Sequence, residues 1–179
     1  MPDQAPGAPG PVVIGFDGSS SATYTVRTAA ALLAPAPALV VVVWEPDLSF
    51  ELLPSPPTIV LAPIDIRATL DIDRSLYDTA QRLAETGAEV ARRAGLDAEG
   101  LVVADDGTVA DTLLRLSRER NARAVVVGTH GRRRLLHQTV GSTALAVVES
   151  ALCPAVVIRH RDADHEPASP SPQERPPSA

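Results

Sequence analysis

Apolar runs alternate with amphipathic segments along most of the chain. Five runs rich in β-branched residues occupy positions 11–16, 38–44, 101–104, 124–127 and 154–158, the third being the weakest. A continuous apolar run is typical of a parallel strand that is buried on both faces. Between these runs, apolar residues recur every three or four positions, which predicts helices. The predicted helices cover residues 20–33, 66–94, 109–120 and 142–150.

Turn and capping residues separate the predicted elements. Asp17 and Gly18 follow the first run, and one of the serines after them can cap the helix that follows. Gly95 ends the second helix, and Asn121 closes the third. The alternation of strands and helices predicts an α/β fold, in which right-handed crossovers place helices on both faces of one parallel sheet.

The loops after the first and fourth strands are where a ligand site is expected. In open parallel sheets, ligands bind beyond the carboxyl ends of the strands, where the strand order reverses. Asp17 ends the first predicted strand and Gly128 the fourth. The sequence therefore predicts that these two positions lie at one site.

The two ends of the chain differ from the middle in composition. Residues 1–10 are mainly Pro, Gly and Ala, and residues 161–179 contain no large apolar side chain, so both are expected to be disordered. The predicted globular domain is 11–160. Within it, residues 46–65 are rich in proline and are expected to form an irregular loop.

Composition and charge exclude several functional classes. A net charge of -6 argues against a nucleic-acid or anionic-membrane surface, so no such partner is expected. All 16 basic residues are Arg, which excludes a P-loop NTPase because that loop needs its Lys. No secretory signal and no apolar run of about 18 residues is visible, so a cytoplasmic protein is expected. Four widely spaced histidines and one cysteine predict neither a metal cluster nor a disulfide framework.

The segment from Gly128 to Ser142 carries the candidate chemistry. Glycines at 128, 131 and 141 permit a positive φ and let a ligand approach the backbone closely. Ser142 begins a predicted helix, where unpaired N–H groups and the positive end of the helix dipole favour a phosphate. The Ser142 hydroxyl could also bond a phosphate oxygen or a phosphate-bound Mg²⁺.

Over about residues 11–160 the chain resembles a single-domain universal stress protein of the ATP-binding type. The family's signature is Gly, two residues, Gly, nine residues, Gly, then Ser or Thr, and residues 128–142 match it without a gap. Asp17, Gly18 and Ser19 after the first strand also resemble the family, as does the stretch from Cys153 to Val157 before the last strand.

The resemblance implies both an architecture and a function. It implies a Rossmann-like sheet of five parallel strands in the order 3-2-1-4-5, and a homodimer joined through the last strand, Ala155 to Arg159. It implies an ATP- or adenine-nucleotide-binding stress-response protein that acts as a regulatory or signalling module, with Mg²⁺ or Mn²⁺ as a possible companion of the nucleotide. Two alternatives stay open: an interaction module of the same family that works without nucleotide, and a slow ATPase.

Individual roles also follow from the resemblance. Asp17 is expected to contact the nucleoside, Val43 to lie against the base, and Val127 to lie beneath it. The glycines and Ser142 are expected to contact ribose and phosphate. The full expected set is Gly15, Phe16, Asp17, Val43, Val127, Gly128, His130, Gly131, Gly141, Ser142 and Thr143.

Two positions depart from the family pattern. A residue that is often Ser or Thr is Ala144 here, which removes one hydroxyl from the expected phosphate site. A position before the fourth strand that is usually acidic is Arg123.

Other polar residues have simpler interpretations. No nucleophile-and-base pair surrounds His130, so no catalytic residue is predicted. Arg132–Arg134 could screen phosphate charge or form a solvated loop face. Asp105 and Asp106 are expected to shape a turn, Cys153 to be an inert thiol, and Trp44 to pack near the mouth of the site.

Overall fold

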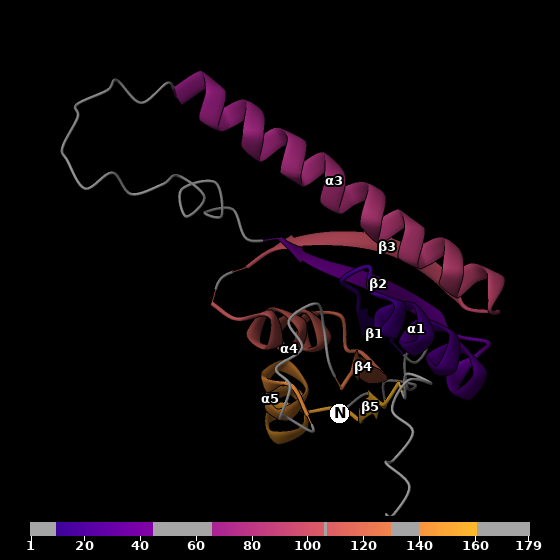
Figure 1. Ribbon diagram of the computed structural model, residues 1–179. Coiled ribbons are helices and arrows are strands. Elements are labelled where there is room, and N and C mark those ends of the chain that lie inside the picture. Colours follow the sequence, from indigo (N-terminus) through magenta and orange to yellow (C-terminus); the bar gives the residue numbers. More distant parts are fainter. Residues whose placement is uncertain (1–9, 45–65, 106, 130–139, 161–179) are drawn as a thin grey trace, which may run out of the picture.

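The computed structural model describes residues 10–44, 66–105, 107–129 and 140–160, with the backbone alone for residues 66–73. In this part of the chain, strands and helices alternate (Figure 1). In chain order the elements are β1 (Val12–Gly15), α1 (Ser20–Leu33), β2 (Pro37–Trp44), α3 (Ile66–Arg93), β3 (Asp97–Ala104), α4 (Val109–Glu119), β4 (Ala124–Gly128), α5 (Ser142–Ser150) and β5 (Ala155–Ile158).

All the strands form one parallel sheet with the order β3-β2-β1-β4-β5, which confirms the predicted order. The central strand β1 lies between β2 and β4, with Ile14 opposite Val40 on one side and Val126 on the other. The strand order reverses between β1 and β4, and in open parallel sheets ligands bind beyond the carboxyl ends of the strands at such a point.

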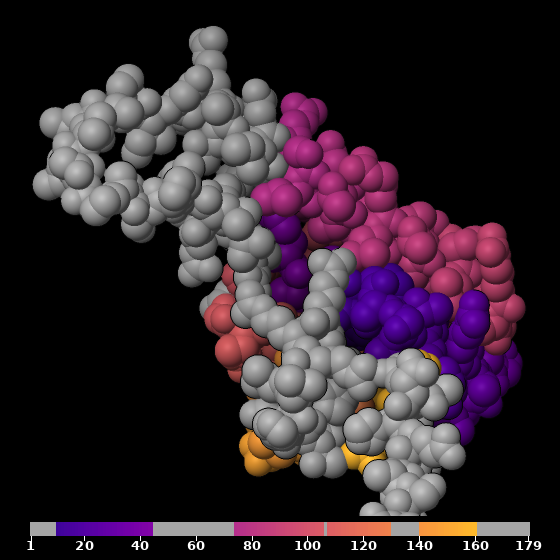
Figure 2. Space-filling view, viewed as in Figure 1, coloured from indigo at the N-terminus to yellow at the C-terminus, as the bar shows by residue number. Residues whose placement is uncertain are grey.

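Successive side chains of each strand point to opposite faces, and helices cover both. Val12 and Ile14 of β1 pack in one core with residues of α1 and α3, whereas Val13 packs in a second core with residues of α4 and α5. Figure 2 shows α3 and α1 side by side, and both helices contribute residues to the first of these cores. Each buried Val, Leu or Ile side chain contributes about 1.5–3 kcal/mol, so these two cores hold the sheet and the helices together.

The predicted boundaries of α1 and α5 are confirmed, but the third strand was predicted too short. β3 begins at Asp97 instead of at residue 101. It is an edge strand, and its first half exposes Asp97, Glu99 and Gly100, so the hydrophobic run that marks a buried strand is missing there. The last strand ends at Ile158, one residue before the predicted Arg159.

Several predicted segments lie outside the described residues. These are nearly all of the two predicted disordered ends and the proline-rich segment 46–65. None of the described helices is long and apolar enough to cross a membrane.

Two glycines let α3 pack closely on the sheet. A Cβ at Gly87 would lie 2.7 Å from a methyl group of Val40 and 2.8 Å from the ring of Phe16. A Cβ at Gly100 in β3 would lie 2.7 Å from the backbone carbonyl of Ala84. At both places a side chain would push the helix off the sheet.

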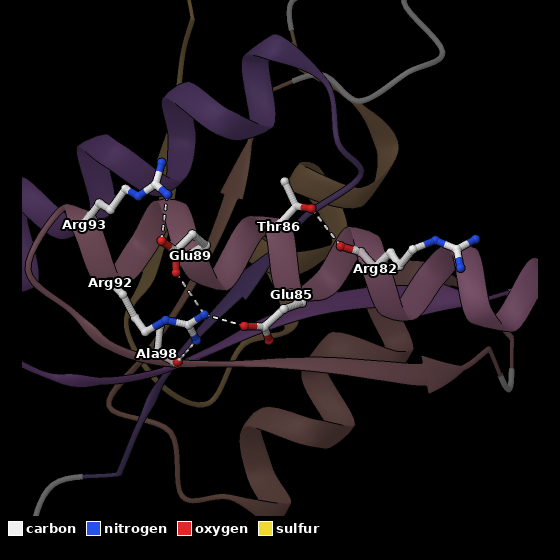
Figure 3. Close-up of polar contacts among 7 residues, drawn as sticks. All are labelled: Arg82, Glu85, Thr86, Glu89, Arg92, Arg93 and Ala98. Atoms are coloured by element: carbon white, nitrogen blue, oxygen red, sulfur yellow. Dashed lines mark hydrogen bonds and ion pairs between the residues drawn. The ribbon is translucent and has the colours of Figure 1, made fainter.

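An arginine at the end of α3 ties that helix to the edge strand. Arg92 donates a hydrogen bond of 2.9 Å from Nη1 to the backbone carbonyl of Ala98, and its Nη2 pairs with Glu85 and Glu89 (Figure 3). The hydrogen bond from Arg92 and the neighbouring Arg93 hold the pKa of Glu89 below its usual value. The outward-facing carbonyl of Ala98 on this edge strand thus accepts a hydrogen bond from a side chain of the same domain.

We expect Gly100→Ala to lower the free energy of unfolding by about 1–3 kcal/mol, because the added methyl group meets helix backbone that cannot rotate away. Gly107→Ala is the matched control, since a Cβ there would lie 3.5 Å from Asp111 Oδ2, an ordinary contact. Urea denaturation of the two variants and the parent measures the difference. Equal stability of both variants would contradict the close approach of α3.

Candidate functional site

The turn after β1 is fixed by a short hydrogen-bond chain. Gly18 adopts a φ of 82°, which reverses the chain directly after Asp17. Asp17 Oδ1 accepts hydrogen bonds from the Ser19 backbone N–H at 3.0 Å and from the Ser19 hydroxyl at 2.7 Å. The Ser19 hydroxyl oxygen in turn accepts from the Ala22 N–H at 3.0 Å, so a serine caps α1 as predicted. Asp17 therefore orients the cap of α1 while standing at the end of β1.

The two ends of the glycine segment meet beyond β4. The backbone N–H of Gly141 donates a hydrogen bond of 2.7 Å to the carbonyl of Thr129, and the N–H of Thr129 bonds the carbonyl of Ile158 at 3.0 Å. Thr129 is 5% exposed. These bonds bring the start of α5 against the carboxyl ends of β4 and β5.

The amino-terminus of α5 differs from those of α1 and α4. Ser19 and Thr108 cap α1 and α4 with side-chain oxygens, but Gly141, at the N-cap of α5, has no side chain and accepts no such bond there. Ser142 is exposed and Thr143 is half-buried. The first N–H groups of a helix have no partner within the helix, so this end of α5 offers donors and a positive dipole to an anion.

The strand register brings the expected residues to one edge. With Ile14 opposite Val40 and Val126, Asp17 comes level with Val43 of β2 and with Thr129 after β4. Asp17, Val43 and the start of α5 therefore lie along the same carboxyl edge of the sheet, as the sequence predicts.

Some residues that the sequence places in the site can offer only their backbone at this edge, because their side chains are buried or absent. Val127 is 3% exposed and Phe16 6%, and both side chains lie in the cores. Gly15 faces Leu113, whose Cδ1 would lie 3.1 Å from a Cβ at that position. The glycine at position 15 thus makes room for α4. Val43 is half-buried and packs beside the core under α4 and α5.

Other expected residues are placed differently or not described. His130, Gly131 and Arg132–Arg134 lie outside the described residues. Ala144 is 1% exposed and packs in the core under α4 and α5. A Ser or Thr at this position would attach its hydroxyl to a buried Cβ. Alanine therefore keeps a polar group out of the core as well as removing a possible phosphate ligand.

The remaining polar candidates have structural surroundings. Trp44 packs edge-to-face on Tyr77, with ring centroids 5.6 Å apart, and its Nε1 is buried with no hydrogen-bond partner among the described residues. Cys153 is a half-buried free thiol. No group of three or more metal-ligating side chains occurs in the described part of the chain.

Thr129 is the residue of this site that the sequence reasoning missed. Its contribution is a backbone carbonyl, which has no signature in a side-chain pattern. The only signal was a polar β-branched residue directly after the fourth strand.

Comparison with known proteins decides the family. The model of the universal stress protein family matches residues 10–159. The chain belongs to the universal stress protein family. No curated protein matches it significantly in sequence.

Solved structures agree with this family and show the fold. The hypothetical protein MJ0577 is 14% identical, with a TM-score of 0.67, over 85% of this chain and 96% of that one. A family protein from Arabidopsis thaliana, solved with AMP bound, is 18% identical with a TM-score of 0.58, over 90% and 98%. A universal stress protein in complex with cAMP is 20% identical with a TM-score of 0.57, over 85% and 98%.

We expect Ser19→Ala to lower the free energy of unfolding by about 1 kcal/mol, because the Ala22 N–H loses its acceptor. The exposed neighbour Ser20, whose hydroxyl makes no hydrogen bond to another described residue, supplies the control Ser20→Ala. Thermal unfolding of both variants measures the difference. If Ser20→Ala destabilises the protein as much, the assigned cap is wrong.

Proposed function

We propose that this universal stress protein binds an adenine nucleotide, ATP above all, at the carboxyl edge of its sheet and acts as a regulatory or signalling module in stress response. The observation that carries the proposal is the amino-terminus of α5. It has a glycine at the N-cap, lacks a side-chain cap, and is held against the end of β4 by the bond between Gly141 and Thr129. Phosphate groups would take the N–H groups of Ser142 and Thr143.

The proposed ligand runs along the edge of the sheet. Phosphates at α5 would leave the ribose near Asp17 and the base near Val43, in the order in which β4, β1 and β2 follow each other. Structures of family members with AMP and cAMP support an adenine nucleotide as the ligand class. The exposed Ser142 hydroxyl could also bond a phosphate-bound Mg²⁺ or Mn²⁺, which would keep most of its waters.

Hydrolysis, if it occurs, is expected to be slow. The chain contains no Lys to neutralise phosphate charge, and the sequence places no nucleophile-and-base pair in the glycine segment. A binding module rather than an efficient ATPase therefore fits the residues. Location in the cytoplasm stays a prediction from the sequence.

We expect ATP at one hundred times its Kd to stabilise the parent protein by about 2.7 kcal/mol in a thermal-shift measurement. Gly141→Asp should abolish this shift, because a carboxylate would stand where the phosphates bind. Ser142→Ala should weaken binding by tenfold at most, the effect of one lost hydrogen bond.

Gln81→Glu is the control for the Gly141→Asp variant, since it adds the same charge on the exposed face of α3. It should leave the ATP shift unchanged. A parent protein that shows no shift with millimolar ATP and Mg²⁺ would refute nucleotide binding and favour the nucleotide-independent interaction module.

We also propose a homodimer joined through β5. The two edges of the sheet differ: Arg92 occupies the Ala98 carbonyl on β3, whereas β5 pairs with β4 alone among the described strands. An edge strand with free backbone groups is a template for pairing with another chain. Beside β5, Leu145, Val148 and Leu152 are 52%, 57% and 82% exposed. Antiparallel pairing of two β5 strands would bring these apolar side chains of both copies together.

Leu152→Asp should shift the protein from dimer to monomer in light scattering, because a charge would be buried against apolar side chains. Leu32→Asp is the matched control, since Leu32 is 64% exposed on α1, which packs on the face of the sheet opposite α5. A dimer that survives Leu152→Asp but is lost with Leu32→Asp would place the interface elsewhere.

A further inference from the structure

Asp105 stands at the carboxyl edge next to the proposed position of the base. Its backbone N–H continues the ladder between β3 and β2 with a 2.8 Å hydrogen bond to the carbonyl of Trp44. Its Oδ1 accepts hydrogen bonds from the Gly107 N–H at 3.0 Å and from the Thr112 hydroxyl at 3.1 Å. The turn-shaping role expected from the sequence is therefore confirmed for Asp105, whereas Asp106, which was expected to share it, lies outside the described residues.

Those two bonds also fix the direction of the carboxylate. Thr112 is 1% exposed and belongs to α4, so its hydroxyl holds Oδ1 from a rigid element. Oδ2 has no hydrogen-bond partner among the described residues, and Asp105 is only half-buried. One oxygen of an oriented carboxylate is thus left as an acceptor for another group.

The position of Asp105 follows from the strand register. Val103 lies opposite Val43, and Asp105 comes two residues later on the same face of β3. Strand spacing and rise place the Cα atoms of Val43 and Asp105 about 8 Å apart. The bond to Thr112 shows that the Asp105 side chain points to the α4 face, on which Val43 also packs.

The direction of the proposed ligand brings its base toward this carboxylate. The sheet order runs from β5 and β4 through β1 and β2 to β3. A nucleotide with phosphates at α5 and ribose near Asp17 lays its base over the end of β2. The edge of the base remote from the ribose then faces the end of β3, where Asp105 stands.

We propose that Asp105 is a specificity-determining residue that reads position 6 of a purine base. The carboxylate accepts a hydrogen bond from the exocyclic amino group of adenine and repels the carbonyl oxygen of a 6-oxo purine. This inference rests on the proposed function, because it assigns the base end of the same site.

A comparison of ATP with inosine triphosphate tests the proposal, since the two ligands differ at position 6 and in the proton on N1. The parent protein should bind ATP about tenfold to a hundredfold more tightly, the effect of one hydrogen bond to a charged acceptor. Asp105→Asn should bring the ratio of the two dissociation constants, inosine triphosphate over ATP, close to one, because the amide NH₂ replaces Oδ2 with a donor. The amide oxygen can still accept from Gly107 and Thr112, so the turn is kept.

Asp97→Asn is the matched control, because Asp97 is an exposed residue at the opposite end of β3 and the variant changes the net charge equally. It should keep the ratio of the parent, as measured by isothermal titration calorimetry with both ligands. Thr112→Val should lower the ratio partly, because the carboxylate loses its orienting donor.

The outcomes separate the two proposals. A parent that binds neither ligand refutes the proposed nucleotide site. A parent that binds ATP and inosine triphosphate equally well overturns the role of Asp105, whether or not the variants fold. An Asp105→Asn variant that folds, binds ATP and keeps the ratio of the parent overturns it as well.

Discussion

Burial of both faces of the central strands is the constraint on which the rest of this structure depends. Val12, Val13 and Ile14 of β1 are fully buried, with neighbouring side chains pointing to opposite faces. Such a strand is stable only if helices cover both faces of the sheet. Each strand must therefore be followed by a crossover, and each crossover leaves the sheet at the same, carboxyl edge. Turns with polar side chains and helix amino-termini gather there, and they form the candidate site.

At that edge, backbone groups contribute more to the candidate site than side chains do. The bond from Gly141 to Thr129 holds the start of α5, and the absence of a side chain at the N-cap keeps its first N–H groups available. Val127 and Phe16 lie at the same edge, but their side chains are buried in the cores. The same division explains why a glycine at position 15 serves packing against Leu113. A site of this kind can bind an anion with few charged residues, which agrees with the absence of Lys.

Much of the fold could be predicted because its strongest signals are local. The boundaries of α1 follow from Ser19 and the apolar spacing after it, and the continuous valine runs indicate parallel strands. The beginning of β3 could not be predicted in this way, because an edge strand with Asp97, Glu99 and Gly100 lacks the apolar run of a buried one. The strand order came from the family resemblance, since the pattern of apolar residues does not encode which strands are neighbours.

The glycine spacing led to the candidate site in the sequence, whereas the backbone contacts within the site leave no pattern in the sequence. The part played by Thr129 depends on a carbonyl that any residue would supply, and the open oxygen of Asp105 depends on Thr112, seven residues away on α4. Likewise, Ala144 looked like a lost ligand in the sequence, but its side chain belongs to a core.

The central claim, that α5 holds the phosphates of a nucleotide, is tested most directly by backbone amide resonances of the labelled protein during titration with ATP and with adenosine. The account predicts that the amides of Ser142, Thr143 and Ala144 shift strongly with ATP and much less with adenosine, which lacks phosphate. If ATP binds while these three amides keep their positions, the phosphates lie elsewhere and the account is contradicted.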